Sequence, residues 1–86
     1  MPDGYHLASS KIRKGELGEI SKIQEELDEL RDAMTQECRI MALLELSDLV
    51  GAIELFLEKH FSDFTIEDVL TMQRITKRAF QNGART

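Results

Sequence analysis

The chain has 86 residues, a formal net charge of −5, no Trp and a single Tyr. A chain this short forms one domain and buries only about 60% of the surface of its unfolded state, so Leu, Ile, Met and Phe must supply the core. Its acidic balance opposes nucleic-acid binding, which depends on cationic surface to displace counterions.

The cysteine count and the length of the apolar runs indicate in which cellular compartment the protein is expected. The single Cys38 cannot form an intrachain disulfide, and the N-terminus has no apolar core segment of the kind found in a signal peptide. The longest apolar run, Leu49–Ile53, is far too short to span a bilayer. We therefore expect a soluble cytoplasmic protein with no membrane partner.

The pattern predicts a single all-α domain over residues 1–86. Residues 1–10 are expected to be a flexible lead, and Gly15 and Gly18 obscure the start of a first long helix that runs to about Met34. A second helix is expected from about Cys38 to Lys59. There is no strand pattern and no Gly-rich phosphate loop.

A third helix is expected from Thr65 to about Phe80. The run Thr65-Ile66-Glu67-Asp68 has the form of a capping box, with Asp in place of the usual Glu or Gln at its last position. Asn82-Gly83 is expected to end this helix, and residues 83–86 to form a flexible tail.

Apolar residues at helical spacing predict a buried stripe on each of the two long helices. The stripes are Ile20, Ile23, Leu27, Leu30 and Met34 in the first helix, and Ala42, Leu46, Leu49, Ile53 and Phe56 in the second. The second helix is apolar nearly all round, so more than one of its faces should be covered. Three short helices rarely achieve this, and we expect a homo-oligomer with a core resembling a four-helix bundle.

Two pairs of acidic residues carry the chemistry. Glu26 and Glu29 are spaced i, i+3, as are Glu45 and Asp48, so the members of each pair lie on one side of their helix. If the two long helices pack face to face, four carboxylates meet between them. Such a cluster repels itself unless a cation binds, and a hard divalent ion such as Mg²⁺ is the natural ligand.

Each pair also has a structural interpretation. Arginines or lysines could neutralise Glu45 and Asp48 as buried salt bridges. The first helix could simply present a solvated acidic face made of Glu25, Glu26, Asp28, Glu29 and Asp32.

The string EExxE, then fifteen residues, then ExxD, resembles the signature of the MazG-like all-α nucleoside triphosphate pyrophosphohydrolases. The similarity covers about residues 15–58. It implies that Glu26, Glu29, Glu45 and Asp48 hold Mg²⁺, with Mn²⁺ as a substitute, and that Glu25 acts as a base for water or as a ligand of a second metal. It also implies dimers or tetramers, and hydrolysis of a nucleoside triphosphate to the monophosphate and pyrophosphate.

Basic residues of the third helix are candidates for binding the substrate's phosphates. Arg74 lies one turn from both Lys77 and Arg78, and no acid follows Asp68. Lys22, one turn before Glu26, resembles a lysine that some members of the family place near the phosphates. Alternatively, the basic residues of the third helix pair with the acidic first helix of the same or a neighbouring chain, or are solvated.

Other chemistries have less support. A di-iron bundle needs Glu-x-x-His, and neither His6 nor His60 follows a Glu at that spacing. No Ser or Cys lies beside a His for nucleophilic catalysis. The second functional hypothesis is a non-catalytic helical oligomer that serves as a metal-binding, nucleotide-binding or regulatory module.

Overall fold

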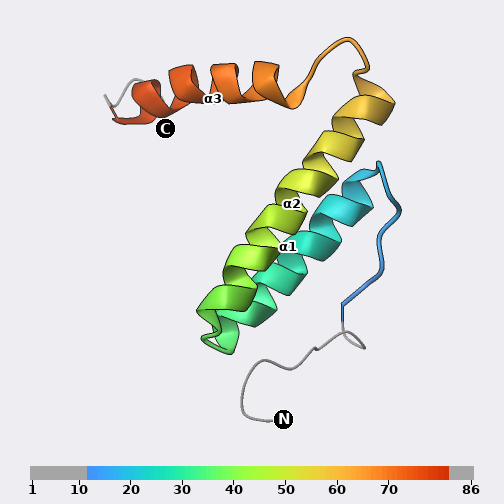
Figure 1. Cartoon of the computed structure of the whole chain (residues 1–86), viewed down its shortest axis with the longest axis vertical. Helices are drawn as coiled ribbons and strands as arrows, with labels where there is room; N and C mark the ends of the chain where they lie inside the picture. Colours follow the sequence, from blue (N-terminus) through green and yellow to red (C-terminus); the bar gives the residue numbers. More distant parts are fainter. Residues whose placement is uncertain (1–11, 82–86) are drawn as a thin grey trace.

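The computed structural model describes residues 12–81, and over this range it contains three helices and no strand. They are α1 (Ile20–Thr35), α2 (Arg39–His60) and α3 (Ile66–Gln81). Figure 1 shows α1 and α2 side by side as an antiparallel hairpin, while α3 leaves the end of α2 and runs away from it. The predicted all-α class is confirmed; the expected lead (1–10) and tail (83–86) lie outside the described residues.

A tight turn joins the two helices of the hairpin. Glu37 adopts a positive φ of 57°, and the backbone N–H of Cys38 donates to the carbonyl of Ala33 at 3.1 Å. Cys38 is the half-buried N-cap of α2. At the other end of the hairpin, Glu19 forms ion pairs with Lys59 and His60, which fix the start of α1 against the end of α2.

The packed face of the hairpin agrees with the predicted one only in part. Large side chains of the expected stripes are exposed: Ile20 to 66%, Met34 to 63% and Leu46 to 45%. The buried residues are instead Glu25, Glu26 and Ala33 of α1 and Ala42, Glu45 and Ala52 of α2. The prediction fails for the exposed side chains, whereas Ala42 is buried as predicted and half-buried positions remain at Ile23, Leu30, Leu49, Ile53 and Phe56. Periodicity finds an apolar stripe but does not say how much of it packs within one chain.

The small side chains explain how the acids come to lie inside. Ala33, Ala42 and Ala52 let the helix backbones approach closely, and this places the glutamates of the same faces between the helices. Many of the large apolar side chains lie on the outside as a result. Those that remain exposed on the hairpin are Ile20, Leu27, Met34, Ile40, Leu43, Leu44, Leu46, Val50 and Leu55.

The third helix begins as predicted. The backbone N–H of Thr65 donates to the Asp68 carboxylate at 2.9 Å, and the Asp68 N–H donates to the Thr65 hydroxyl at 3.4 Å. This reciprocal pair confirms the capping box, with the shorter Asp in the role of Glu. Within the described range, α3 contacts α2 where the two meet and does not contact α1. A search of the same residues finds no helix that is both long and apolar enough to cross a membrane.

Candidate metal centre

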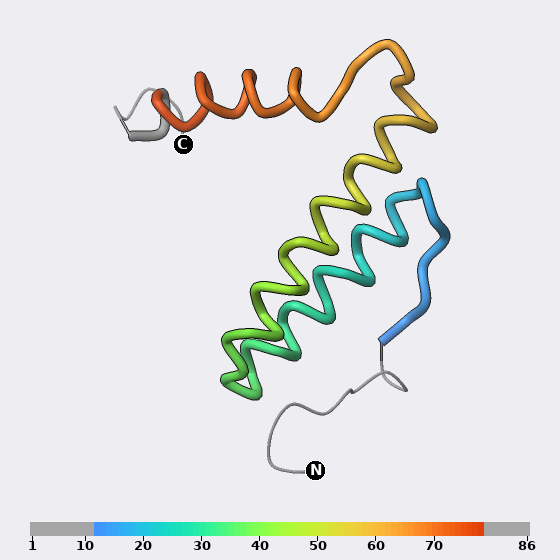
Figure 2. Tube along the Cα trace, in the orientation of Figure 1, coloured from blue at the N-terminus to red at the C-terminus, as the bar shows by residue number. Residues whose placement is uncertain are grey.

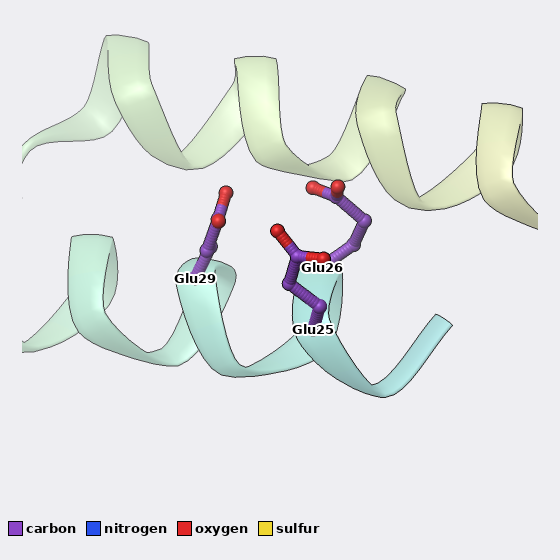
Figure 3. A group of neighbouring side chains, drawn as sticks. All are labelled: Glu25, Glu26 and Glu29. Carbon is purple, nitrogen blue, oxygen red and sulfur yellow. The ribbon is translucent and has the colours of Figure 1, made fainter. Parts of the chain in front are cut away.

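The hairpin brings the predicted acidic residues together between α1 and α2. Ligand oxygens of Glu26, Glu45 and Asp48 lie within 4.8 Å of one another, and those of Glu25, Glu26 and Glu29 form a second group of the same size. Glu26 belongs to both groups and so joins them. Figure 3 shows the side chains of Glu26 and Glu29 extending from α1 toward α2. We call these five residues the acidic cluster.

Burial differs across the acidic cluster. Glu25, Glu26 and Glu45 are 4%, 6% and 3% exposed, Glu29 is half-buried, and Asp48 is exposed. Three nearly dry carboxyl groups in one place are costly unless each is paired or binds a cation. The exposed Asp48 marks the side from which an ion or a phosphate could enter.

Two buried oxygens of the acidic cluster have no hydrogen-bond partner. They are Oε1 of Glu26 and Oε1 of Glu45, one from each predicted pair. A buried acceptor left without a partner costs about 1–3 kcal/mol, and more when the group is charged. The arrangement therefore leaves electron-rich oxygens from both helices free to bind a cation.

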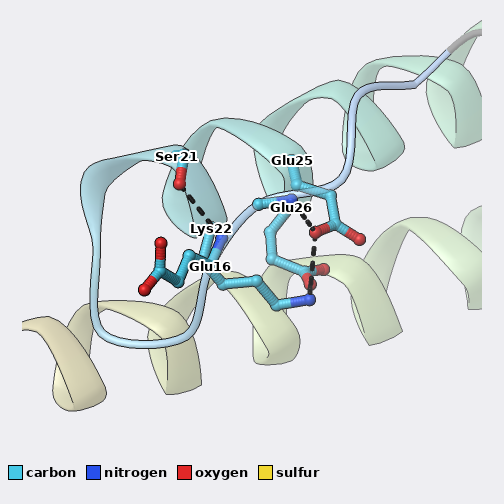
Figure 4. A network of polar contacts seen from close by, with 6 residues as sticks. Glu16, Ser21, Lys22, Glu25 and Glu26 are labelled. Carbon is cyan, nitrogen blue, oxygen red and sulfur yellow. Dashed lines mark hydrogen bonds and ion pairs between the residues drawn. The ribbon is translucent and has the colours of Figure 1, made fainter.

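Lys22 is the one cation of the described residues that is paired with the acidic cluster. Its Nζ lies 3.0 Å from Oε2 of Glu26 and 3.2 Å from Oε1 of Glu25, as Figure 4 shows in part. The hydrogen bond to Glu26, with that to Glu25, raises the pKa of Lys22, so the ammonium stays charged. One ammonium against five acidic groups leaves the centre strongly negative.

A loop before α1 holds Glu25 in place. The backbone N–H of Gly15 donates to Oε1 of Glu25 at 2.8 Å, the same oxygen that accepts from Lys22. Burial pushes the pKa of Glu25 upward, but these two donors outweigh it and lower the pKa below its usual value. A carboxylate held this firmly in its ionised form is a weak base. Its geometry favours the ligand role over the base role that the sequence also allowed.

The pKa values of Glu45 and Glu29 are shifted in the opposite direction, upward. Burial raises the pKa of Glu45 to about 7, helped by its hydrogen bond to Glu29 and by the negative charges of Glu29, Asp48 and Glu26. Burial and the charge of Glu26 also raise the pKa of Glu29. Buried carboxylates this close together resist ionisation unless a proton or a cation is bound among them.

Neutralisation by lysine or arginine, or a solvated acidic face, accounts for some of the acidic residues but not for all of them. Among the ion pairs of residues 12–81, none involves Glu45 or Asp48, so no lysine or arginine of the described chain neutralises that pair. Lys22 partly neutralises Glu25 and Glu26. The solvated-face interpretation does fit Asp28, which pairs at the surface with Arg31 and Gln24.

The predicted phosphate-binding residues divide into two groups. Lys22 lies in the acidic cluster, whereas Arg74, Lys77 and Arg78 are exposed on α3, which points away from the hairpin. The chain does not bring this basic group to its own cluster. His60 is an exposed residue at the end of α2, and its ring contacts Glu19.

Gly15 is the residue of the site that the sequence did not reveal. A Cβ built on it would lie 2.2 Å from the backbone oxygen of Ser21, so no side chain fits.

We expect Gly15→Ala to displace the loop, to release Glu25 and to lower the free energy of unfolding by about 1–3 kcal/mol. Gly51→Ala is the control, because a Cβ there meets no atom of the chain within 4 Å and should stabilise α2 by up to about 1 kcal/mol. Urea unfolding curves measure both, and equal effects would contradict the packing described for the loop.

No protein family, curated protein or solved structure matches this chain in comparisons of sequence and structure. The similarity to the MazG-like enzymes therefore rests on the two acidic motifs and their spacing.

Proposed function

We propose that this protein is a Mg²⁺-dependent nucleoside triphosphate pyrophosphohydrolase. The observation that carries the proposal is the pair of unpartnered buried oxygens, one on Glu26 and one on Glu45, inside a cluster of five acidic residues. The acidic residues of a helix surface are normally solvated, whereas Glu25, Glu26 and Glu45 are nearly fully buried.

The donor set suits the proposed metal. Every ligand is a carboxylate oxygen, and hard cations such as Mg²⁺ and Mn²⁺ prefer oxygen ligands. Glu26, Glu29, Glu45 and Asp48 would hold the ion, and the second oxygen of Glu25 would contribute from the flank. When bound, Mg²⁺ would neutralise charge on the triphosphate oxygens and make a bound water more acidic.

The chain's own groups have distinct tasks in the proposed reaction. Asp48, on the open side of the acidic cluster, lies where substrate would arrive. The ammonium of Lys22 would stabilise phosphate charge. A water would attack the α-phosphorus and give its proton to a carboxylate of the cluster; the bond between the α-phosphorus and the α–β bridging oxygen would break, releasing pyrophosphate and the monophosphate.

We also propose that the protein acts as a homo-oligomer, a dimer or a tetramer. Nine large apolar side chains of the hairpin are exposed in the single chain, and none of the large apolar side chains of the described residues is fully buried. Patches of this kind mark interaction surfaces. Pairing two hairpins would cover part of them in a core like that of a four-helix bundle.

The test is pyrophosphate release from a panel of ribo- and deoxyribonucleoside triphosphates with Mg²⁺, in water enriched in ¹⁸O. We expect pyrophosphate and a monophosphate that carries the label. Asp48→Asn should lower the rate by about a hundredfold or more because it removes a ligand. Asp28→Asn, at the surface pair with Arg31, should have no effect.

The alternative function, a non-catalytic metal-binding or nucleotide-binding oligomer, predicts a different result. It would retain metal-dependent stabilisation but release no pyrophosphate from any nucleotide. If the rate were equal in the wild type and in Asp48→Asn, the assignment of the site would be wrong.

A further inference from the structure

The third helix has an apolar face that its own chain leaves uncovered. Met72 and Ile75 lie on this face and are each 65% exposed, and α3 contacts only the end of α2. A helix of 16 residues is marginally stable alone in water, because most helical stability in proteins comes from packing an apolar face. A surface that covers this face would therefore stabilise α3.

The same helix cannot serve the acidic cluster of its own chain. Glu45 lies fifteen residues before the end of α2, which is about 22 Å along the helix axis. Arg74 lies eight residues beyond the start of α3, about 12 Å further, and α3 does not fold back along the hairpin (Figures 1 and 2). An arginine side chain is too short to close such a gap.

A second copy of the chain offers a complementary surface. Its hairpin exposes Leu43, Leu44, Leu46 and Val50 on the helix that carries Glu45 and Asp48. Beyond Asp68, the charged residues of α3 are all basic, whereas the acidic cluster has Lys22 as its one paired cation within the described chain. Both elements expose apolar side chains, and the charge of α3 beyond Asp68 is opposite to that of the acidic cluster.

We propose that α3 is an arm exchanged between two copies of the chain. Its apolar face packs on the α1–α2 hairpin of the partner, and Arg74, Lys77 and Arg78 reach the rim of the partner's acidic cluster. Two such arms, related by a twofold axis, contribute to both sites of a dimer. The part of this inference that concerns phosphate binding rests on the proposed function, whereas the exchange of the arm does not.

Mixed dimers test whether the sites are shared. One full-length variant, Glu45→Gln, has a damaged metal site and an intact arm. The other, Arg74→Ala with Arg78→Ala, has an intact metal site and an arm that lacks two of its basic residues. Ala keeps helix propensity at these exposed positions, so the second variant should fold. Unfolding and refolding an equal mixture should yield heterodimers that each contain one intact site, about a quarter of all sites.

The expected result is that each variant alone is nearly inactive and that the mixture regains about a quarter of the wild-type rate of pyrophosphate release. No recovery, with an active wild type, would overturn the shared site. Arg31→Ala, which removes a surface cation of α1, is the control and should keep the wild-type rate.

A second measurement does not depend on catalysis. Isotope-filtered NMR on a mixture of labelled and unlabelled wild-type chains should show contacts from the methyl groups of Val69, Met72 and Ile75 to the hairpin of the other chain. Such contacts in a protein that releases no pyrophosphate would support the arm while the proposed function fails. Their absence would overturn the arm, whatever the enzyme assay shows.

Discussion

In the absence of divalent metal, the wild-type protein should lose about 2 kcal/mol of unfolding free energy between pH 5 and pH 8, and Glu45→Gln should remove most of this loss. The cause is the pKa of Glu45, which burial and its carboxylate neighbours raise to about 7 from an ordinary value of 4.5. The folded protein holds this proton more tightly than the unfolded chain does. Protonated Glu45 therefore contributes its full amount to the free energy of unfolding below pH 4.5. This contribution is lost as the pH rises through 7.

Urea unfolding in EDTA at a series of pH values measures the effect. The loss should be smaller than the full pKa difference implies, because the acidic cluster opens to solvent at Asp48. Asp28→Asn should keep the wild-type pH dependence, since Asp28 lies in a surface pair. If stability were constant across this range in the wild type, Glu45 would not be held among buried carboxylates as described.

Replacing Lys22 by Met should change metal-free stability and metal affinity in opposite directions. Without metal, the variant leaves the buried carboxylates of Glu25 and Glu26 without their ammonium, and we expect a loss of about 2 kcal/mol. With metal, the variant should bind Mn²⁺ about tenfold more tightly, because oxygens that Lys22 occupies become available and a nearby positive charge is gone. Its rate of hydrolysis should fall, since the proposed contact to phosphate is lost.

Thermal melting with and without Mn²⁺, together with calorimetry, separates these effects. Lys59→Met is the matched control: Lys59 pairs with Glu19 at the edge of the hairpin, away from the acidic cluster, and should leave metal affinity unchanged. Metal binding that is equal or weaker in Lys22→Met would show that the ammonium and the ion do not share the carboxylates of Glu25 and Glu26.

Local signals in the sequence predicted the parts of the structure that depend on neighbours along the chain. The i, i+3 spacing placed Glu26 with Glu29 and Glu45 with Asp48, and the hairpin sets these pairs between α1 and α2. The capping box at Thr65 depends on residues three positions apart and was equally readable. Each of these features needs only the geometry of one helix, or of two helices joined by a short turn.

Features that depend on distant contacts could not be read in this way. The hydrogen bond from Gly15 to Glu25 joins residues ten apart through an irregular loop, and no periodic pattern marks it. The interior of acids and alanines was hidden because the large apolar residues dominate the helical pattern, although several of them, such as Met34 and Leu46, are exposed in the single chain. The direction of α3 is set at the connection after His60, where the sequence indicated only that one helix ends and another begins.

The most direct test of the account is calorimetric titration of the metal-free protein with Mg²⁺ and Mn²⁺, comparing the wild type with Glu45→Gln and with the surface control Asp28→Asn. The acidic cluster predicts saturable binding in the wild type and in the control, and affinity at least about tenfold weaker in Glu45→Gln, which removes one charged ligand. Weak binding of equal strength in all three proteins would contradict the account, because it would mean that the buried carboxylates between α1 and α2 do not form a metal site.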